Sequence, residues 1–364
     1  MTYVNPNIFF LFLSEQIVLW DFASHRQYKF STEYLNRLVS LARGESMDTA
    51  LNQIDAELQV AGLISDSPYV DCFHSWGWDS LSRIFHVGTK DVPWDCRPET
   101  NGKWAEQYVD SCMELLSTEI PLRSSPNGRI IRLPMPDTSI FEEMSLWGAL
   151  KKRKSCRKFQ CATTPLSVVG SILYASFGFI QERAFEINEF VPPFLRYRRT
   201  SPSGGGLNTA EAYLVAIDIV GLKRGVYHYD AEMHHLTFVG EIQKERMGEL
   251  LLGQYFANDL SFGVFLTSRL DRMWWKYKHS RAYRVCLLEI GHLSQTFQLC
   301  ATAAGMQTWL SGAFQDTAVE RFLKLDSSIE QTFLFVGAGY SDGDDLDVER
   351  RNILNLRSEG GDDD

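Results

Sequence analysis

With 364 residues, of which 45% are hydrophobic and 13% aromatic, the chain is long enough for one large domain and a smaller one. Its formal net charge of −10 at pH 7 argues against a nucleic-acid partner held by bulk electrostatics. No stretch contains the roughly 18 consecutive apolar residues that a transmembrane helix requires, so we expect no membrane span. The seven cysteines form no C-x-x-C pair, which predicts reduced thiols in a cytoplasmic protein without a metal site.

Residues 1–65 are expected to form a small N-terminal unit. Two strand-like runs, Phe9 to Leu13 and Ile17 to Asp21, precede an amphipathic helix from Thr32 to Ala42. The triplet Ser46-Met47-Asp48 is expected to cap a second helix. This order resembles a winged-helix arrangement, which predicts a peptide-recognition or accessory domain. An additional layer on the main core is an equally good interpretation.

The rest of the chain divides into three parts by composition. Residues 66–140 are rich in aromatic residues and proline, so we expect an irregular connecting segment without long helices. Residues 141–345 alternate helical and strand-like runs, and residues 346–364 form an acidic tail. Within 141–345 the patterns predict helices over 146–151, 166–177 and 283–304, and strands over 212–219, 225–230, 236–239, 261–267 and 332–336.

A basic run begins at residue 151, and its part from Arg153 to Phe159 reads Arg-Lys-Ser-Cys-Arg-Lys-Phe. In an extended segment, alternate side chains lie on one side, so Arg153, Ser155 and Arg157 would face the same way. Two guanidinium groups and a hydroxyl can hold a phosphate through charge-assisted hydrogen bonds. By composition alone, a solvated basic run explains the same residues.

A glycine turn, which we define as Pro202 to Gly206, precedes an apolar strand-like run. Glycine permits positive φ and a close approach of the backbone to a ligand. Free N–H groups in such a turn can bind an anion or a flat, heteroatom-rich ring. The run matches neither the P-loop nor the Rossmann fingerprint, and a flexible turn is the alternative.

Further motifs follow these two runs in a fixed order. They are Gly225-Val226-Tyr227-His228-Tyr229-Asp230, Lys276-Tyr277 ahead of Arg284, and Leu288-Glu289-Ile290-Gly291-His292 with Gln295. The order resembles the SagB-type dehydrogenases of the FMN-dependent nitroreductase superfamily, which include the thiazole/oxazole-forming enzymes that mature ribosomal peptides. The upstream block from Arg83 to Asp91 resembles the same family.

The resemblance implies an α+β fold, in which a nitroreductase-like mixed sheet is flanked by helices. It also implies a homodimer with two FMN sites at the subunit interface, each using both chains. The helix predicted over 283–304 fits such an interface, or alternatively the centre of one chain. The implied FMN-binding residues are Arg153, Ser155, Arg157, Pro202, Ser203, Gly204, Gly205, Gln295 and Arg351, with Arg350 as the alternative to the last.

Lys276 and Tyr277 match the catalytic pair of the azoline oxidases. Oxidation of an azoline removes a Cα proton and transfers a hydride to flavin, and a tyrosinate or a neutral lysine can take that proton. The alternative is a surface aromatic cluster, formed with Trp274 and Trp275, around a snorkelling lysine.

For several histidines and for Glu289, the sequence favours structural roles. We expect His228 and His292 to be structural. We expect Glu289, in an apolar helix, to have a buried partner such as Arg284 or a backbone N–H. His234 and His235 lack further residues at metal-ligand spacing.

Three functions stay open from the sequence. The first is oxidation of azoline rings, or of a similar peptide Cα–X bond, in a precursor peptide, with a cyclodehydratase or another peptide-modifying enzyme as a possible partner. The second is an NAD(P)H-dependent flavin reductase acting on dehydroamino acids, enones or nitro groups. The third is a non-catalytic scaffold that binds a peptide by strand addition.

Overall fold

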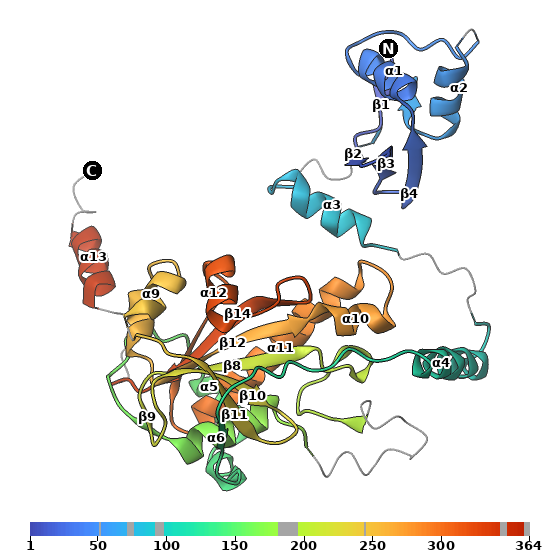
Figure 1. The fold of residues 1–364 in the computed structure, drawn as a ribbon. Coiled ribbons are helices and arrows are strands. Elements are labelled where there is room, and N and C mark those ends of the chain that lie inside the picture. The colour runs from blue at the N-terminus through green and yellow to red at the C-terminus, as the bar shows by residue number, and fades with distance from the viewer. Residues whose placement is uncertain are drawn as a thin grey trace. The chain divides into compact units, whose positions relative to one another are not determined.

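The computed structural model describes residues 1–50, 52–70, 76–91, 98–180, 196–243, 245–342 and 348–359. The chain divides into two compact units, residues 1–97 and residues 98–364, which we describe separately (Figure 1). None of the helices in the described ranges combines the length and the apolar character that a membrane crossing requires.

The first unit is built on a three-stranded antiparallel sheet. Its strands are β2 (Ile8–Leu13), β3 (Gln16–Asp21) and β4 (Arg26–Phe30), in that spatial order. Next come the helices α1 (Thr32–Ala42), α2 (Gln53–Val60) and α3 (Ser80–Gly88), and the short strands β1 (Tyr3–Val4) and β5 (Ile64–Ser65) pair with each other. The small core joins Leu19, Leu38, Leu41, Leu58, Leu63 and Ile64.

The two helices predicted in this unit form, but the second begins later than expected. The prediction of α1 is confirmed at both ends, whereas the predicted cap at Ser46-Met47-Asp48 is wrong. The side chain of Asn52 instead accepts a hydrogen bond from the backbone N–H of Ile54 at 3.0 Å. Because that bond satisfies one of the first free N–H groups of α2, the helix begins at Gln53.

The expectation of an irregular segment over 66–140 is wrong. This segment contains α3 and the 16-residue helix α4 (Asn101–Leu116). Asp79 caps α3 and Thr100 caps α4, each through its side-chain oxygen. No proline lies inside either helix, so the prolines separate the helices instead of preventing them.

The second unit contains a seven-stranded sheet whose neighbouring strands all pair antiparallel. Its spatial order is β13 (Gln307–Ser311), β14 (Glu330–Gly339), β12 (Phe262–Arg269), β8 (Ala210–Ala216), β10 (Gly225–Asp230), β11 (His235–Gly240) and β6 (Ile130–Arg132). Parallel pairing occurs between β7 (Thr164–Pro165) and β9 (Ile219–Val220), and at a bridge between Ser155 and Thr308. The strands predicted over 225–230, 236–239, 261–267 and 332–336 are confirmed, whereas the run predicted over 212–219 forms β8 only as far as Ala216, and Ile219 belongs to β9.

Helices cover both faces of this sheet (Figure 1). One face packs against α6 (Leu166–Phe177) and α11 (Ala282–Ala303), and the other packs against α9 (Arg246–Leu250) and α12 (Asp316–Leu323). Along β8, Leu214 belongs to the first core, and Tyr213 and Val215 belong to the second. This alternation is the period of a strand that is buried on both faces.

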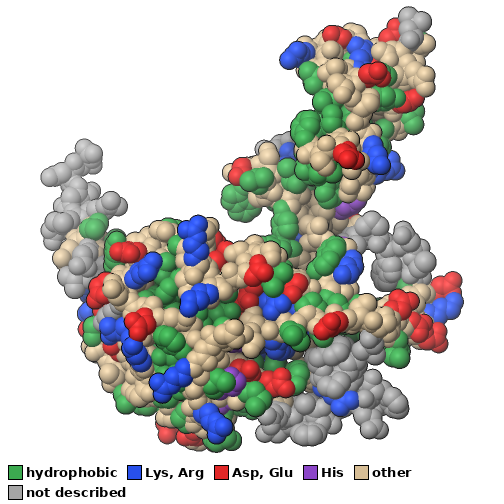
Figure 2. All heavy atoms as spheres, viewed as in Figure 1, with side chains coloured by type: hydrophobic (Ala, Val, Ile, Leu, Met, Phe, Trp, Pro, Cys, Tyr) green, Lys and Arg blue, Asp and Glu red, His purple; other side chains and the backbone are tan. Residues whose placement is uncertain are grey.

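The other elements of this unit are short or lie near its end. They are α5 (Leu146–Lys152), α10 (Leu270–Lys276), α13 (Val348–Glu359), and the 3-10 turns η1 (Thr138–Phe141), η2 (Gly204–Gly206) and η3 (Tyr255–Asp259). The predicted helices over 146–151, 166–177 and 283–304 are confirmed as α5, α6 and α11. In Figure 2, acidic and basic side chains are interspersed over the visible face of this unit.

Candidate functional site

The glycine turn has a backbone that only glycine adopts without strain. Gly205 and Gly206 have φ values of +62° and +69°, in the left-handed region. A Cβ atom on Gly204 would lie 2.2 Å from Cγ1 of Val285, and one on Gly205 would lie 2.5 Å from the hydroxyl of Tyr277. Glycine is therefore required both for the conformation of the turn and for its packing against α10 and α11.

Ser203 ties the glycine turn to α11. Its hydroxyl donates to Oε2 of Glu289 at 2.9 Å and accepts from the backbone N–H of Asn208 at 2.8 Å. Glu289 is 2% exposed and also accepts from the Thr209 hydroxyl and from the Ala210 N–H, both at 3.2 Å. One carboxylate therefore fixes both the turn and the start of β8.

Glu289 faces Arg199 across 3.7 Å, and both side chains are buried. The expected backbone N–H partner of Glu289 is confirmed, but the arginine is Arg199 and not Arg284. Residue 284 precedes Glu289 by five positions, which places it about 140° away around the helix. Desolvation and the nearby Arg123 lower the pKa of Arg199 to about 10. Because this value is still well above neutral pH, Arg199 stays charged there.

The structure brings Lys276 and Tyr277 to the glycine turn. Nζ of Lys276 donates to the carbonyl oxygen of Gly205 at 3.3 Å, and the Tyr277 hydroxyl lies against the α-carbon side of the same residue. Adjacent residues reach one point because α10 ends at Lys276 and Tyr277 is extended, with φ −119° and ψ 96°. The sequence alone did not show where the backbone bends.

Tyr277 is a protonated phenol at neutral pH. Burial raises its pKa above the ordinary value, and the charge of Lys276 only partly opposes that effect. A tyrosinate is therefore disfavoured here, whereas a hydrogen-bond donor is available.

The run from Arg153 to Arg157 pairs with the edge strand β13. The N–H of Cys156 donates to the carbonyl of Thr308 at 2.9 Å, and Cys156 itself is buried. Within the described ranges, the side chains of Arg153, Ser155 and Arg157 make no hydrogen bond or ion pair with the protein. This donor set of two guanidinium groups and one hydroxyl fits the phosphate of a mononucleotide.

The other predicted cofactor-binding residues occupy different places. The carbonyl of Pro202 lies 3.4 Å from Nδ1 of His292 on α11. Gln295 is exposed about one turn further along α11, and Arg351 is exposed on α13. On the same helix, Arg350 lies with its guanidinium 5.5 Å from the centre of the Phe256 ring.

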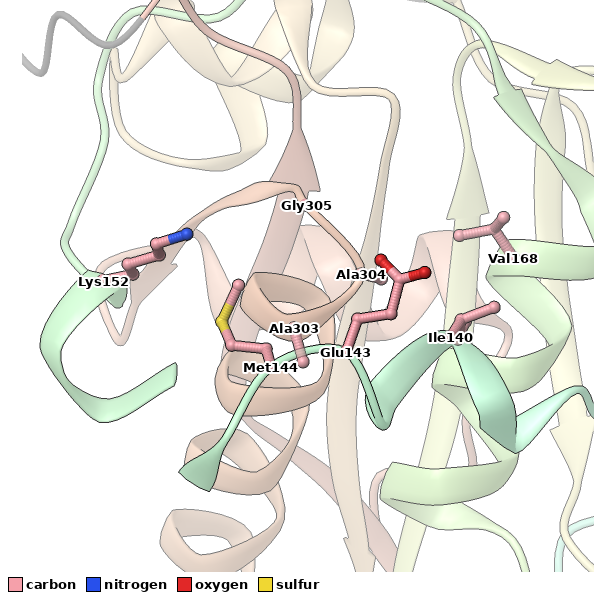
Figure 3. Close-up of a pocket in the computed structure, with 8 residues that line it drawn as sticks. All are labelled: Ile140, Glu143, Met144, Lys152, Val168, Ala303, Ala304 and Gly305. Atoms are coloured by element: carbon pink, nitrogen blue, oxygen red, sulfur yellow. The ribbon is translucent and has the colours of Figure 1, made fainter. Parts of the chain in front are cut away.

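Two cavities adjoin these segments. One of about 250 Å³ lies beside the glycine turn, lined by Pro202, Ser203, Gly204, Val285, Leu288, Glu289 and His292. Figure 3 shows the other cavity, of about 490 Å³, which lies between α6, the end of α11 and the segment that precedes α5. Lys152 lines it and directly precedes Arg153, so this cavity reaches the start of the basic run.

Sequence reasoning missed a buried charge cluster at the start of β8. Glu211 lies 3.2 Å from Nε2 of His228 and 3.9 Å from the guanidinium of Arg123. Burial alone raises the pKa of Glu211, but His228 and the two nearby arginines outweigh burial and lower it. His228 therefore has a structural partner, which agrees with its predicted role.

The comparisons with known proteins decide the family. The model of the nitroreductase family matches residues 150–340. The chain belongs to the nitroreductase family. A nitroreductase-family protein of Methanocaldococcus jannaschii is 30% identical over 202 residues, which are 54% of this chain and 92% of that protein. The family and the fold predicted from the sequence are thus confirmed.

A second relative and one solved structure extend this result. Trifolitoxin-processing protein TfxB of Rhizobium leguminosarum bv. trifolii is 31% identical over 139 residues, which are 36% of this chain and 37% of that protein. The crystal structure of a nitroreductase-family protein of Anabaena variabilis ATCC 29413 superimposes with a TM-score of 0.53 and 18% identity, covering 76% of this chain and 49% of that one. At this identity the likeness concerns the fold alone.

Proposed function

We propose that the protein is a SagB-type, FMN-dependent dehydrogenase that oxidises azoline rings in a ribosomally made precursor peptide. One observation carries the proposal: Lys276 and Tyr277 converge on the glycine turn, where the flavin ring is expected. The similarity to a trifolitoxin-processing protein supports a peptide as the substrate.

Arg153, Ser155 and Arg157 would hold the FMN phosphate, and Pro202 to Gly205 would line the ring. The side chains of Arg153, Ser155 and Arg157 make no hydrogen bond or ion pair with the described residues, and the backbone of the turn is half-buried, which supports this assignment. When bound, the flavin supplies the hydride acceptor that the oxidation requires. Gln295 and Arg351 stay proposed contacts to the same cofactor.

The protein's own part in the reaction is the removal of a proton. The amine of Lys276, in its deprotonated form, would take the Cα proton of the azoline ring, and the Tyr277 phenol would donate a hydrogen bond beside it. The Glu289–Ser203 contact keeps the turn in place while this happens.

A homodimer would complete the site. The basic run lies beside β13 at one edge of the sheet, whereas the glycine turn precedes β8 in its interior. Leu287 and Leu288 on α11 are 41% and 60% exposed, and an interface between two copies would bury them. Each FMN would then contact the basic run of one chain and the glycine turn of the other.

The first unit is proposed to bind the leader of the precursor peptide. Strand β2 is an edge of its sheet, so its free backbone groups can pair with an extended peptide. Deleting the whole unit, residues 1–97, is expected to weaken binding of the full precursor and to leave FMN content intact. Loss of flavin or aggregation on deletion would make this unit a structural layer.

The decisive experiment follows the flavin absorbance without oxygen. A precursor peptide that carries azolines should bleach the flavin and lose two hydrogens per ring by mass spectrometry. Bleaching by NADPH together with no reaction with the peptide would instead establish a reductase. A purified protein that neither contains nor takes up flavin would favour the scaffold function.

A further inference from the structure

Helix α4 carries a tyrosine that reaches the catalytic lysine. Nζ of Lys276 donates to the hydroxyl of Tyr108 at 3.3 Å and lies 5.1 Å from the centre of the Tyr108 ring. The Tyr277 ring centre lies 5.6 Å from the same nitrogen, and Gly205 accepts its other hydrogen bond. The amine of Lys276 is therefore held by two aromatic rings, one hydroxyl and one carbonyl.

Lys276 differs in its partners from the lysines of this protein that form ion pairs with carboxylates. Among the residues that the structure describes, no carboxylate lies within ion-pair distance of its Nζ atom. A carboxylate would fix the positive charge on the amine, whereas a phenol and two ring faces stabilise that charge without neutralising it. An ammonium formed on Lys276 by proton transfer would therefore find two acceptors and two ring faces already in place.

Tyr108 also stacks on a second aromatic ring of its own helix. Trp104, one helical turn earlier on α4, stacks on its ring with centres 5.4 Å apart and planes 9° apart. Burial and the neighbouring Cys112 raise the pKa of Tyr108, so its hydroxyl is neutral at neutral pH. Tyr108 therefore presents a neutral oxygen and a fixed ring face to Lys276.

We propose that Tyr108 is a positioning residue that holds Lys276 over the glycine turn and stabilises the ammonium formed on proton transfer. The proposal rests on the proposed function. In the step concerned, the Cα–H bond of the azoline would break and its proton would form a new N–H bond on Lys276. The adjacent Cβ–H bond would break as well, its hydride would reduce the oxidised flavin, and the Cα–Cβ bond of the ring would become a double bond. Tyr108 then accepts a hydrogen bond from an ammonium in place of an amine, which favours the product of the step.

A chemical test needs no turnover. Trace acetylation with acetic anhydride, read by mass spectrometry, compares the extent of labelling of Lys276 with that of Lys278. Lys278 serves as the internal reference, and its Nζ lies 5.0 Å from the centre of the Trp274 ring. Labelling of Lys276 relative to Lys278 should rise about three- to tenfold in Tyr108→Phe, which keeps the ring and loses the hydroxyl, and further in Tyr108→Leu. A ratio within about 1.5-fold of the parent in both variants would overturn the proposal.

A kinetic test addresses the role in the reaction. Tyr108→Phe should slow flavin reduction by saturating peptide about tenfold with peptide affinity unchanged, and should have no further effect in a Lys276→Ala background. Tyr255→Phe, at an exposed tyrosine on η3, is the matched control. Equal slowing in both backgrounds would mean that Tyr108 acts independently of Lys276, against the proposal. If no peptide bleaches the parent, the proposed function fails, and the labelling ratio still decides whether Tyr108 holds Lys276.

Discussion

Replacing Glu289 by glutamine should destabilise the protein and loosen the glycine turn. The substitution keeps the size of the side chain but turns one acceptor oxygen into an NH₂ donor, among partners that all donate: Ser203, Thr209 and Ala210. It also leaves the buried Arg199 without its carboxylate. Removing one partner of a buried ion pair costs about 3–5 kcal/mol.

Urea unfolding of the parent and of Glu289→Gln, followed by circular dichroism, measures this cost. Glu249→Gln is the control, because Glu249 is exposed on α9, and we expect a change below about 0.5 kcal/mol there. Ser203→Ala should fall between the two, at about 1–3 kcal/mol, because it leaves the Asn208 N–H without its acceptor. A loss below about 1 kcal/mol for Glu289→Gln would refute the idea that this carboxylate anchors the turn.

Three further results are expected. The purified Arg157→Ala variant should contain less flavin and be paler than the parent, because losing a bidentate phosphate contact costs about 1.5–3 kcal/mol, or about 10- to 150-fold in FMN affinity. A variant as yellow as the parent would show that Arg157 does not contact the cofactor. Lys276→Ala should slow single-turnover flavin reduction by about 10²–10⁴ at unchanged FMN occupancy, and Tyr277→Phe should slow it less; rates within about threefold of the parent in both would make the pair structural. Arg37 holds the pKa of Asp55 below its ordinary value through hydrogen bonds of 2.6 and 2.7 Å. The contribution of this ion pair to the free energy of unfolding is therefore present above the unfolded pKa of about 3.9, and it is lost as the pH falls through the folded pKa. The protection factors of the α1 and α2 amides, which correct for the intrinsic pH dependence of exchange, should therefore fall in acid in the parent and should already be low at neutral pH in Asp55→Asn. Equal protection factors in the parent and the variant at pH 7 would contradict this account.

Local patterns were enough to predict most elements of the second unit. The apolar run over 166–177 and the alternating run before Ile217 became α6 and β8, because each has a clear period and lies deep in the core. Helix α4 was missed because prolines before and after it made the whole segment look irregular. Its cap at Thr100 is a signal that the sequence did contain.

The contacts of the site were harder to predict, because they join residues far apart in the chain. Glu289 in an apolar helix indicated a buried partner, but only the fold showed that Arg199 reaches it while Arg284 turns away. Tyr108 had no local signal at all. It comes to Lys276 from a helix that the sequence did not predict, across 168 residues.

The crowding at Gly204 and Gly205 bears on how this chain can change. Any side chain at Gly205 would collide with the tyrosine that is proposed to assist the chemistry, and any at Gly204 would collide with Val285. Mutant libraries meant to alter the substrate range should therefore keep both codons constant. The exposed positions Val109 and Met113, on the helix that carries Tyr108, offer variation without that collision.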